Sequence, residues 1–142
     1  MKLKVKKLTP EAKIPSYANP GDAGLDLTAV GERFDLEHRF VEYKFGLALE
    51  IEKGYVGLIF PRSSNSKKDL ILSNCVGVVD SSYRGEITAR FKNLVPSGAK
   101  KYFVGDKIAQ LVIVETPKVE IEEVSELSDT ARGSGGYGSS GN

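Results

Sequence analysis

The 142-residue sequence has few of the side chains from which disulfides and metal centres are built. It contains one cysteine, Cys75, and one histidine, His38. A single cysteine excludes an internal disulfide and a multi-cysteine zinc site, and a single histidine excludes the paired histidines of an HExxH motif. We expect His38 to occupy a solvated loop or strand position and Cys75 to be a buried structural thiol.

The sequence also lacks an excess of charge and a long apolar run. Its 20 lysines and arginines are balanced by 19 acidic residues, for a net charge of +1, which argues against a protein that coats nucleic acid. Apolar runs such as residues 108–114 are too short to span a bilayer, and the first seven residues alternate lysines with apolar residues where a secretory signal needs a continuous apolar stretch. We therefore expect a cytoplasmic protein without membrane or nucleic-acid partners.

What the sequence does have is the periodicity of β-strands. Apolar and polar residues alternate in four segments, which predicts half-buried strands at 3–5, 25–29, 45–51 and 87–91. Short apolar runs rich in β-branched residues predict strands buried on both faces at 55–60, 75–79 and 108–114. Turn signals separate these segments, and one short helix fits near 63–69. The pattern predicts a single all-β domain, built as a sandwich, barrel or jelly roll.

Glycine is concentrated at the end of the sequence. Residues 132–142 read RGSGGYGSSGN, hold five of the 15 glycines, and cannot pack a core. Composition alone allows three interpretations: a flexible terminus, a binder of single-stranded nucleic acid, or a lid. In a lid, glycine N–H groups and serine hydroxyls approach phosphate oxygens, Arg132 adds charge, and Tyr137 offers a flat face to a base.

Four interior motifs carry polar residues where strands begin, end or turn. They are AGLDL at 23–27, PRSS at 61–64, GVVDSSYRG at 77–85 and GDKIAQL at 105–111. Arg62 and Ser63 can bind an anion at a strand end, and Gln110 is an amide inside an apolar run that needs a partner. Asp80 ends an apolar run, so we expect a partly desolvated carboxylate suited to a general base. Taken singly, each motif is weak evidence of a site and is more typical of an ordinary turn, a satisfied core amide or a turn carboxylate.

Taken together and in order, the motifs resemble those of the homotrimeric dUTPase family, the dUTP nucleotidohydrolases. The resemblance is carried by residues 23–27, 61–64, 74–85, 105–111 and 132–141. It implies a jelly-roll-like β subunit and an enzyme that hydrolyses dUTP to dUMP and pyrophosphate. That reaction limits uracil incorporation into DNA and supplies dUMP for dTMP synthesis.

The resemblance also implies roles for individual residues around the nucleoside. The aspartate matching Asp80 activates the water that attacks the α-phosphorus. Residues matching Asn74, Gly77 and Val78 bind the edge of the uracil. The tyrosine matching Tyr83 packs under the deoxyribose and leaves no room for a 2′-hydroxyl.

Other residues are implied to hold the triphosphate and its metal. Within the β domain these are Arg62, Ser63, Ser64 and Gln110. In the tail they are Arg132, Gly135, Gly136, Tyr137, Gly138, Ser139 and Ser140, of which Tyr137 covers the uracil. Mg²⁺ is expected to be bound chiefly by the triphosphate, with Asp26 acting indirectly, through water or through arginine contacts.

The implied organisation is a β domain of residues 1–130 followed by a flexible Gly/Ser-rich lid of residues 131–142. In the family's homotrimer, the motif holding Asp80 comes from one subunit, the phosphate-binding motifs from a second, and the tail from a third. A monomer is therefore expected to be inactive.

Three residues depart from the family pattern, and two rival functions share part of the evidence. Ser64 stands where glycine is usual, which disfavours positive φ there, Ser82 replaces a frequent aspartate, and Tyr137 replaces a commoner phenylalanine. A dCTP deaminase has the same fold but uses a glutamate base and lacks the stacking tail. A nucleotide-switched protein-binding module needs no catalysis. The presence of Asp80 and of the tail favours the hydrolase.

Overall fold

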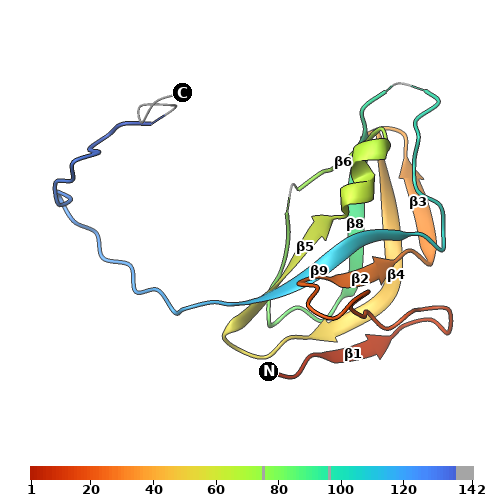
Figure 1. Cartoon of the computed structure of the whole chain (residues 1–142), viewed down its shortest axis with the longest axis horizontal. Helices are drawn as coiled ribbons and strands as arrows, with labels where there is room; N and C mark the ends of the chain where they lie inside the picture. The colour runs from red at the N-terminus through yellow and green to blue at the C-terminus, as the bar shows by residue number, and fades with distance from the viewer. Residues whose placement is uncertain (75, 96, 137–142) are drawn as a thin grey trace.

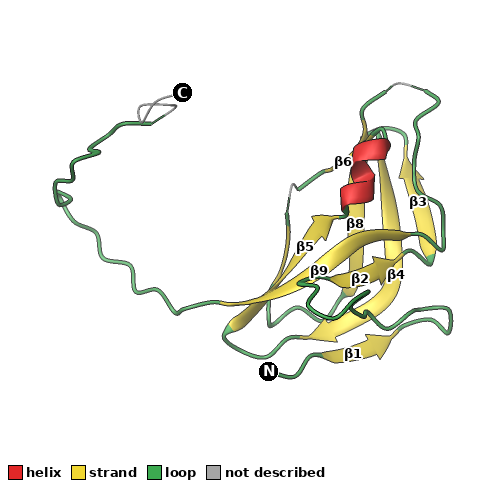
Figure 2. Ribbon diagram, viewed as in Figure 1, coloured by secondary structure: helices red, strands yellow, loops and turns green. Residues whose placement is uncertain are grey.

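The computed structural model of the chain describes residues 1–74, 76–95 and 97–136. It consists almost entirely of β-strands, with one short 3₁₀ helix, η1 (Figure 2). In chain order the elements are β1 (Lys4–Lys7), β2 (Leu25–Thr28), β3 (Gly31–Asp35), β4 (Phe40–Glu50), β5 (Tyr55–Pro61), η1 (Ser63–Lys67), β6 (Leu70–Leu72), β7 (Gly77–Val79), β8 (Glu86–Asn93) and β9 (Lys107–Glu115). The all-β class expected from the sequence is confirmed.

The strands form two antiparallel sheets that share one hydrophobic core (Figure 1). One sheet has the order β1-β4-β8-β6, with β3 also pairing with β4, and the other has the order β2-β9-β5-β7. Val41, Tyr43 and Phe45 alternate along β4 and are fully buried, facing core residues of the other sheet such as Leu27 and Leu111. Each such side chain contributes about 1.5–3 kcal/mol through burial.

A glycine bends the longest strand, β4, in the middle. Gly46 has φ of +64°, and the pairing of β4 with β8 shifts in register between Lys44 and Ala48. A left-handed conformation of this kind is accessible to glycine at no steric cost and is typical of a β-bulge. The bulge brings the backbone of β4 against the start of β8, beside the pocket described below.

The expectation of strands buried on both faces is wrong for β5, β7 and β9. Their burial alternates, and Val78 is 60% exposed. The cause is that the outer face of the β2-β9-β5-β7 sheet is itself apolar, so the sequence lacks the polar alternation of a half-buried strand. Strands β3 and β6 were not anticipated, whereas the helix expected near 63–69 is present as η1.

The chain leaves the sheets after β9. The N–H group of Thr116 still donates to the carbonyl of Gly54, and the described residues from 117 to 134 are all exposed. Figure 1 shows this segment running away from the two sheets. No described helix is long and apolar enough to cross a bilayer.

Candidate active site

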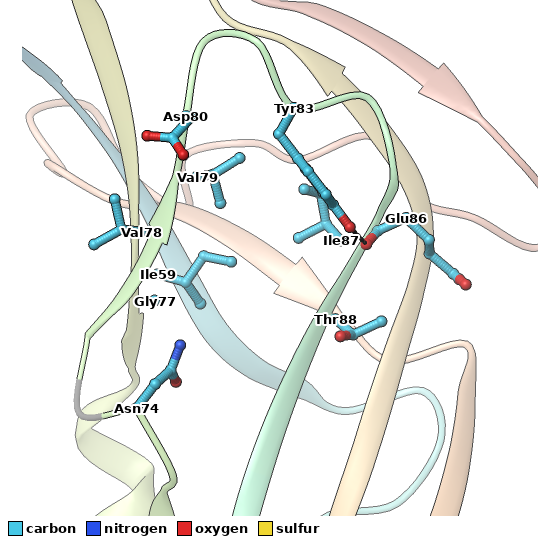
Figure 3. A pocket seen from close by; sticks show the side chains of 10 residues that line it. All are labelled: Ile59, Asn74, Gly77, Val78, Val79, Asp80, Tyr83, Glu86, Ile87 and Thr88. Atoms are coloured by element: carbon cyan, nitrogen blue, oxygen red, sulfur yellow. Dashed lines mark hydrogen bonds between the residues drawn. The ribbon is translucent and has the colours of Figure 1, made fainter.

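A pocket opens between the short strand β7 and the start of β8 (Figure 3). Five residues selected from the sequence line it together: Asn74, Gly77, Val78, Asp80 and Tyr83. Its volume of about 190 Å³ is below the roughly 300–1,000 Å³ of a complete ligand pocket. This base pocket, as we call it, therefore suits one part of a larger ligand.

The wall of the base pocket is the backbone of an edge strand. β7 pairs with β5 on one side only, because it ends the order β2-β9-β5-β7. The peptide groups on its other side are outside the ladder and free to bind a planar polar edge. A Cβ atom on Gly77 would lie 3.2 Å from Ile59 Cβ and 3.4 Å from the side-chain nitrogen of Asn74, so glycine lets this backbone sit close to both.

Asp80 follows the last residue of β7 and stands at the rim of the pocket (Figure 3). In the single chain it is exposed, so the expectation of a partly desolvated carboxylate is wrong here. The reason is the two-residue period of the strand: Val79 points into the core, and the next side chain points out of it. An exposed carboxylate at a pocket rim remains able to accept a proton from a water molecule.

A second cluster, the cation cluster, gathers around the buried carboxylate of Asp26 on β2. Arg62 Nε lies 2.9 Å from Asp26 Oδ1, and Lys107 Nζ lies 2.8 Å from Oδ2, an ion pair outside hydrogen-bonding geometry. The Asp26 side chain is 8% exposed, whereas the arginine and lysine side chains are 32% and 48% exposed. One carboxylate thus holds two cations that still face solvent, an arrangement suited to binding an anion.

Ser63 and Gln110 share the depression that is lined by Asp26 and Arg62. The amide of Gln110 donates to the carbonyl of Pro61 at 3.3 Å, which supplies the partner expected for a polar group in an apolar run. A Cβ atom on Gly24 would lie 2.6 Å from Gln110 Oε1. Glycine at this position therefore makes room for the glutamine side chain.

Ser64 lies apart from its neighbour Ser63. Its hydroxyl is 3.2 Å from the hydroxyl of Tyr102, and it lines an adjoining depression with Arg62 and Lys68. Among described non-glycine residues, positive φ occurs at Arg39 and not at Ser64, so serine in place of the usual glycine carries no backbone strain.

The base pocket and the cation cluster have no lining residue in common. They lie at opposite edges of one sheet, with β7 beside the first and β2 beside the second. Three strand spacings separate these edges, or about 14 Å. Within one chain, the groups that suit a base and those that suit phosphates are therefore not adjacent.

The predicted tail residues lie away from both pockets. Arg132, Gly135 and Gly136 line neither of them. Arg132 Nε donates to the carbonyl of Gly135 at 2.9 Å within a turn of the tail itself. Tyr137, Gly138, Ser139 and Ser140 lie outside the described residues, as does Cys75.

The sequence profile of the dUTPase family matches residues 10–141. The chain belongs to the dUTPase family. It is 42% identical to the deoxyuridine 5′-triphosphate nucleotidohydrolase of Rhodococcus erythropolis, over 99% of this chain and 87% of that one. It is 41% identical to the protein of the same name from Helicobacter pylori strain 26695, over 99% and 97% of the two chains.

Solved dUTPase structures have the same fold. A variant of the Staphylococcus bacteriophage 80alpha dUTPase, determined with dUpNHpp, matches with a TM-score of 0.86 and 28% identity over 99% of both chains. A variant dUTPase from phage phi11 of S. aureus, described as coordinating a structural Mg(II) ion, matches with a TM-score of 0.74 and 27% identity over 89% of this chain and 98% of that one.

Two residues of this dUTPase-family chain were not singled out from its sequence. Lys107 pairs with Asp26 because the β2–β9 register places Lys107 across from Thr28, two residues along β2 from Asp26. Glu86 lines the base pocket and accepts the hydroxyl of Tyr83 through its backbone carbonyl. The Lys107 contact depends on the pairing of β2 with β9, and the Glu86 contact depends on how the chain folds between Tyr83 and Glu86, so a motif encodes neither.

His38 is exposed, which confirms the solvated position expected from the sequence. Its ring Nδ1 lies 3.1 Å from Asp35 Oδ1, and its backbone N–H holds the pKa of Asp35 below the usual value. In residues 1–74, 76–95 and 97–136, no three His, Cys, Asp or Glu side chains gather as a metal site.

Proposed function

We propose that this chain is a dUTP diphosphatase, which hydrolyses dUTP to dUMP and pyrophosphate. The observation that carries the proposal is the pairing of a backbone-walled base pocket, with Asp80 at its rim, with a separate cluster of cations on the same sheet. Membership of the dUTPase family supports the same activity.

The base pocket reads uracil through the free edge of β7. Peptide groups at Gly77 and Val78 and the amide of Asn74 pair with the carbonyl and N–H groups of the base. Cytosine presents a different donor pattern, and each buried group left unpaired costs about 1–3 kcal/mol. Tyr83 borders the sugar and excludes a 2′-hydroxyl.

The cation cluster holds the phosphate chain. Arg62 is oriented by Asp26, and Ser63 and Gln110 add neutral donors in the same depression. Charge neutralisation and positioning supply most of the catalysis in phosphoryl transfer, so few reacting groups are needed. A nearly neutral protein can bind a polyanion in this way, because Arg62 and Lys107 lie together at one site.

Asp80 acts as the general base. Its carboxylate accepts a proton from a water molecule as the water oxygen bonds to the α-phosphorus. The bond from that phosphorus to the bridging oxygen breaks, and pyrophosphate leaves. Exposure of Asp80 in the single chain gives the water access before the site closes.

Mg²⁺ belongs to the substrate rather than to a protein metal site. Both oxygens of Asp26 face cations, and the described residues form no cluster of three metal-ligating side chains. The oxygens of the triphosphate are therefore the main ligands, and Asp26 acts indirectly through Arg62 and Lys107. Bound in this way, Mg²⁺ neutralises part of the phosphate charge.

A complete site forms between copies of the chain in a homotrimer. The outer face of the β2-β9-β5-β7 sheet carries paired apolar residues, including Leu58, Val112 and Val78. Val78 lines the base pocket and Val112 lines the depression of the cation cluster, so this apolar face joins the two features, which we call half-sites. Burying it against other copies brings the base pocket of one chain to the cation cluster of the next.

The tail completes the site as a lid on a neighbouring copy, with residues 1–130 as the β domain and 131–142 as the lid. Support comes from the exposed course of the chain after β9. Arg132 reaches the terminal phosphate, and backbone N–H groups at Gly135 and Gly136 follow the phosphate chain.

The test is product release from dUTP, dTTP, dCTP and UTP with Mg²⁺. We expect pyrophosphate from dUTP, with far slower turnover of the other three nucleotides. Ammonia released from dCTP would instead identify a deaminase. Binding of dUTP without turnover would identify a nucleotide-switched binding module.

A further inference from the structure

The ring of Tyr83 is folded back across its own chain. Its hydroxyl donates to the backbone carbonyl of Glu86 at 3.1 Å (Figure 3). The ring lies against Gly85, where a Cβ atom would overlap it. The turn before it is closed by the N–H of Tyr83 donating to the carbonyl of Asp80 at 3.0 Å. Arg84 Nη1 donates to the carbonyl of Ser81 at 2.7 Å, which closes the same turn from its other end.

Gly85 leaves the space that this ring fills. A Cβ atom on Gly85 would lie 2.5 Å from Tyr83 Cζ and 3.0 Å from Cε2, and closer still to the hydroxyl oxygen. Real Cβ atoms do not make such contacts, so any larger residue forces the ring to move. Gly85 does not have the positive φ that favours glycine, which means that the absent side chain, not the backbone conformation, is what the site uses.

The acceptor of this hydrogen bond is itself anchored. The N–H of Gly46, at the β4 bulge, donates to Glu86 Oε1 at 3.2 Å, and Lys44 Nζ lies 3.9 Å from Oε2. The bulge is closely packed, because a Cβ atom on Gly46 would lie 3.0–3.2 Å from Val30, Thr9 and Ala12. The first residue of β8 is thus tied to a fixed point of β4, and its carbonyl does not drift.

We propose that Gly85 and Glu86 are positioning residues that fix the Tyr83 ring at the base pocket, where the sugar of the nucleotide lies, and so set the preference for 2′-deoxyribose over ribose. The inference rests on the proposed function, in which Tyr83 borders the sugar. A tyrosine held only by the turn can rotate about its side-chain torsions and admit a 2′-hydroxyl. A ring fixed at its hydroxyl end cannot yield, so the clash with ribose is not relieved.

The experiment compares kcat/KM for dUTP with kcat/KM for UTP in Gly85→Ala. We expect the ratio to fall by about tenfold or more, mainly because turnover of UTP rises. A general folding defect lowers both values together and leaves the ratio unchanged. Gly31→Ala is the matched control, because its Cβ atom would lie 3.8 Å from the nearest atom, Lys44 Cβ, in ordinary contact.

Two further variants test the hydroxyl end of the clamp without adding bulk. Tyr83→Phe keeps the ring and removes its bond to Glu86, and we expect a smaller fall in the ratio, about threefold, typical of one lost hydrogen bond. Glu86→Ala frees the carbonyl from the β4 bulge and also lowers the ratio. Glu86→Gln keeps an acceptor for the Gly46 N–H and restores most of the ratio.

Coupling between the two residues decides whether Gly85 acts through Tyr83. In a Tyr83→Ala background the ring is gone, so adding Gly85→Ala has no further effect on the ratio. An unchanged ratio in both Gly85→Ala and Tyr83→Phe, or an equal fall with and without Tyr83, overturns the clamp. Should Gly85→Ala not fold, an unchanged ratio in Tyr83→Phe and Glu86→Ala overturns it. Absence of dUTP turnover by the unmodified chain contradicts the proposed function instead.

Discussion

Asp26 and Arg62 form an ion pair of 2.9 Å across the end of the β2-β9-β5-β7 sheet, with the carboxylate almost fully buried. Lys107 holds the second oxygen of the same carboxylate. The buried acid therefore does not meet the triphosphate directly in the proposed site. It fixes the directions of two cations that do face solvent, which makes it a positioning residue for phosphate binding.

Asp26→Asn is expected to lower kcat/KM for dUTP by about 10–100-fold, because a displacement of Arg62 by about 1 Å is enough to cost that much. Asparagine keeps the shape of the side chain and removes its charge. Steady-state kinetics check the prediction. Asp35→Asn, at a residue that lines neither half-site, is the control and should stay within about twofold of the unmodified chain. Equal kinetics for both variants would show that Asp26 does not position Arg62 for phosphate binding.

A mixing experiment tests whether active sites are shared between copies. Asp80→Asn and Arg62→Ala are each expected to be nearly inactive alone. In trimers formed at random from equal amounts of the two, each half-site has an even chance of being intact, so about a quarter of the sites are complete. We expect about a quarter of the activity of the unmodified chain after the two are unfolded and refolded together.

Failure of activity to return in the mixture would contradict shared sites. If both half-sites of a working site came from one chain, every chain in the mixture would carry one defect and activity would not return. Separately refolded variants, combined afterwards without exchange of subunits, serve as the control and should stay inactive.

Much of the fold could be predicted from the sequence because local periodicity encodes it. The alternation of residues 45–51 predicts a half-buried strand, and β4 covers residues 45–50 of that segment, although residues 45–49 are buried on both faces of the sheet. β3 escaped because its residues Glu32, Arg33 and Phe34 are exposed and leave no apolar period. The motifs identified Asp80 and Arg62, but not their separation: Asp80 follows the edge strand β7, whereas Arg62 pairs with Asp26 on β2, the opposite edge of the same sheet.

The roles of residues that contact neighbouring strands could not be predicted from the sequence. Lys107 and Glu86 acquire their roles from the β2–β9 register and from the β4 bulge, respectively. Register depends on how whole strands pair, so the residues next to a motif do not determine it. The exposure of Asp80 has a related cause: the apolar run before it predicts burial on both faces, whereas only alternate residues of β7 are buried.

Deleting residues 132–142 should leave the β domain folded but nearly inactive. The described residues 117–134 are exposed and bury no core side chain, so we expect the free energy of unfolding to change by less than about 1 kcal/mol. Thermal unfolding and kcat/KM for dUTP measure the two effects. A truncated protein that loses its folded structure, or one that keeps full activity, would contradict the role of the tail as a lid.

Alkaline stability should depend on Tyr43. Burial raises the pKa of its hydroxyl, which donates to the carbonyl of Tyr102 at 3.0 Å. The neutral form is therefore favoured in the folded state, and its stabilising effect, complete below the unfolded pKa of about 10, is lost as pH rises above that value by about 1.4 kcal/mol per pH unit. Urea unfolding at pH 9, 10 and 11 should show a loss that begins near pH 10 and approaches this slope at pH 11. Tyr43→Phe should lack the Tyr43 contribution, whereas Tyr17→Phe, at an exposed tyrosine, should keep it.

In the proposed reaction, Asp80 activates a water molecule that attacks the α-phosphorus of dUTP. The most direct measurement is hydrolysis of dUTP with Mg²⁺ in ¹⁸O-labelled water, followed by mass spectrometry of both products. We expect one ¹⁸O atom in dUMP, none in pyrophosphate, and no reaction in Asp80→Asn. Label in pyrophosphate, formation of dUDP and phosphate, or an active Asp80→Asn variant would contradict it.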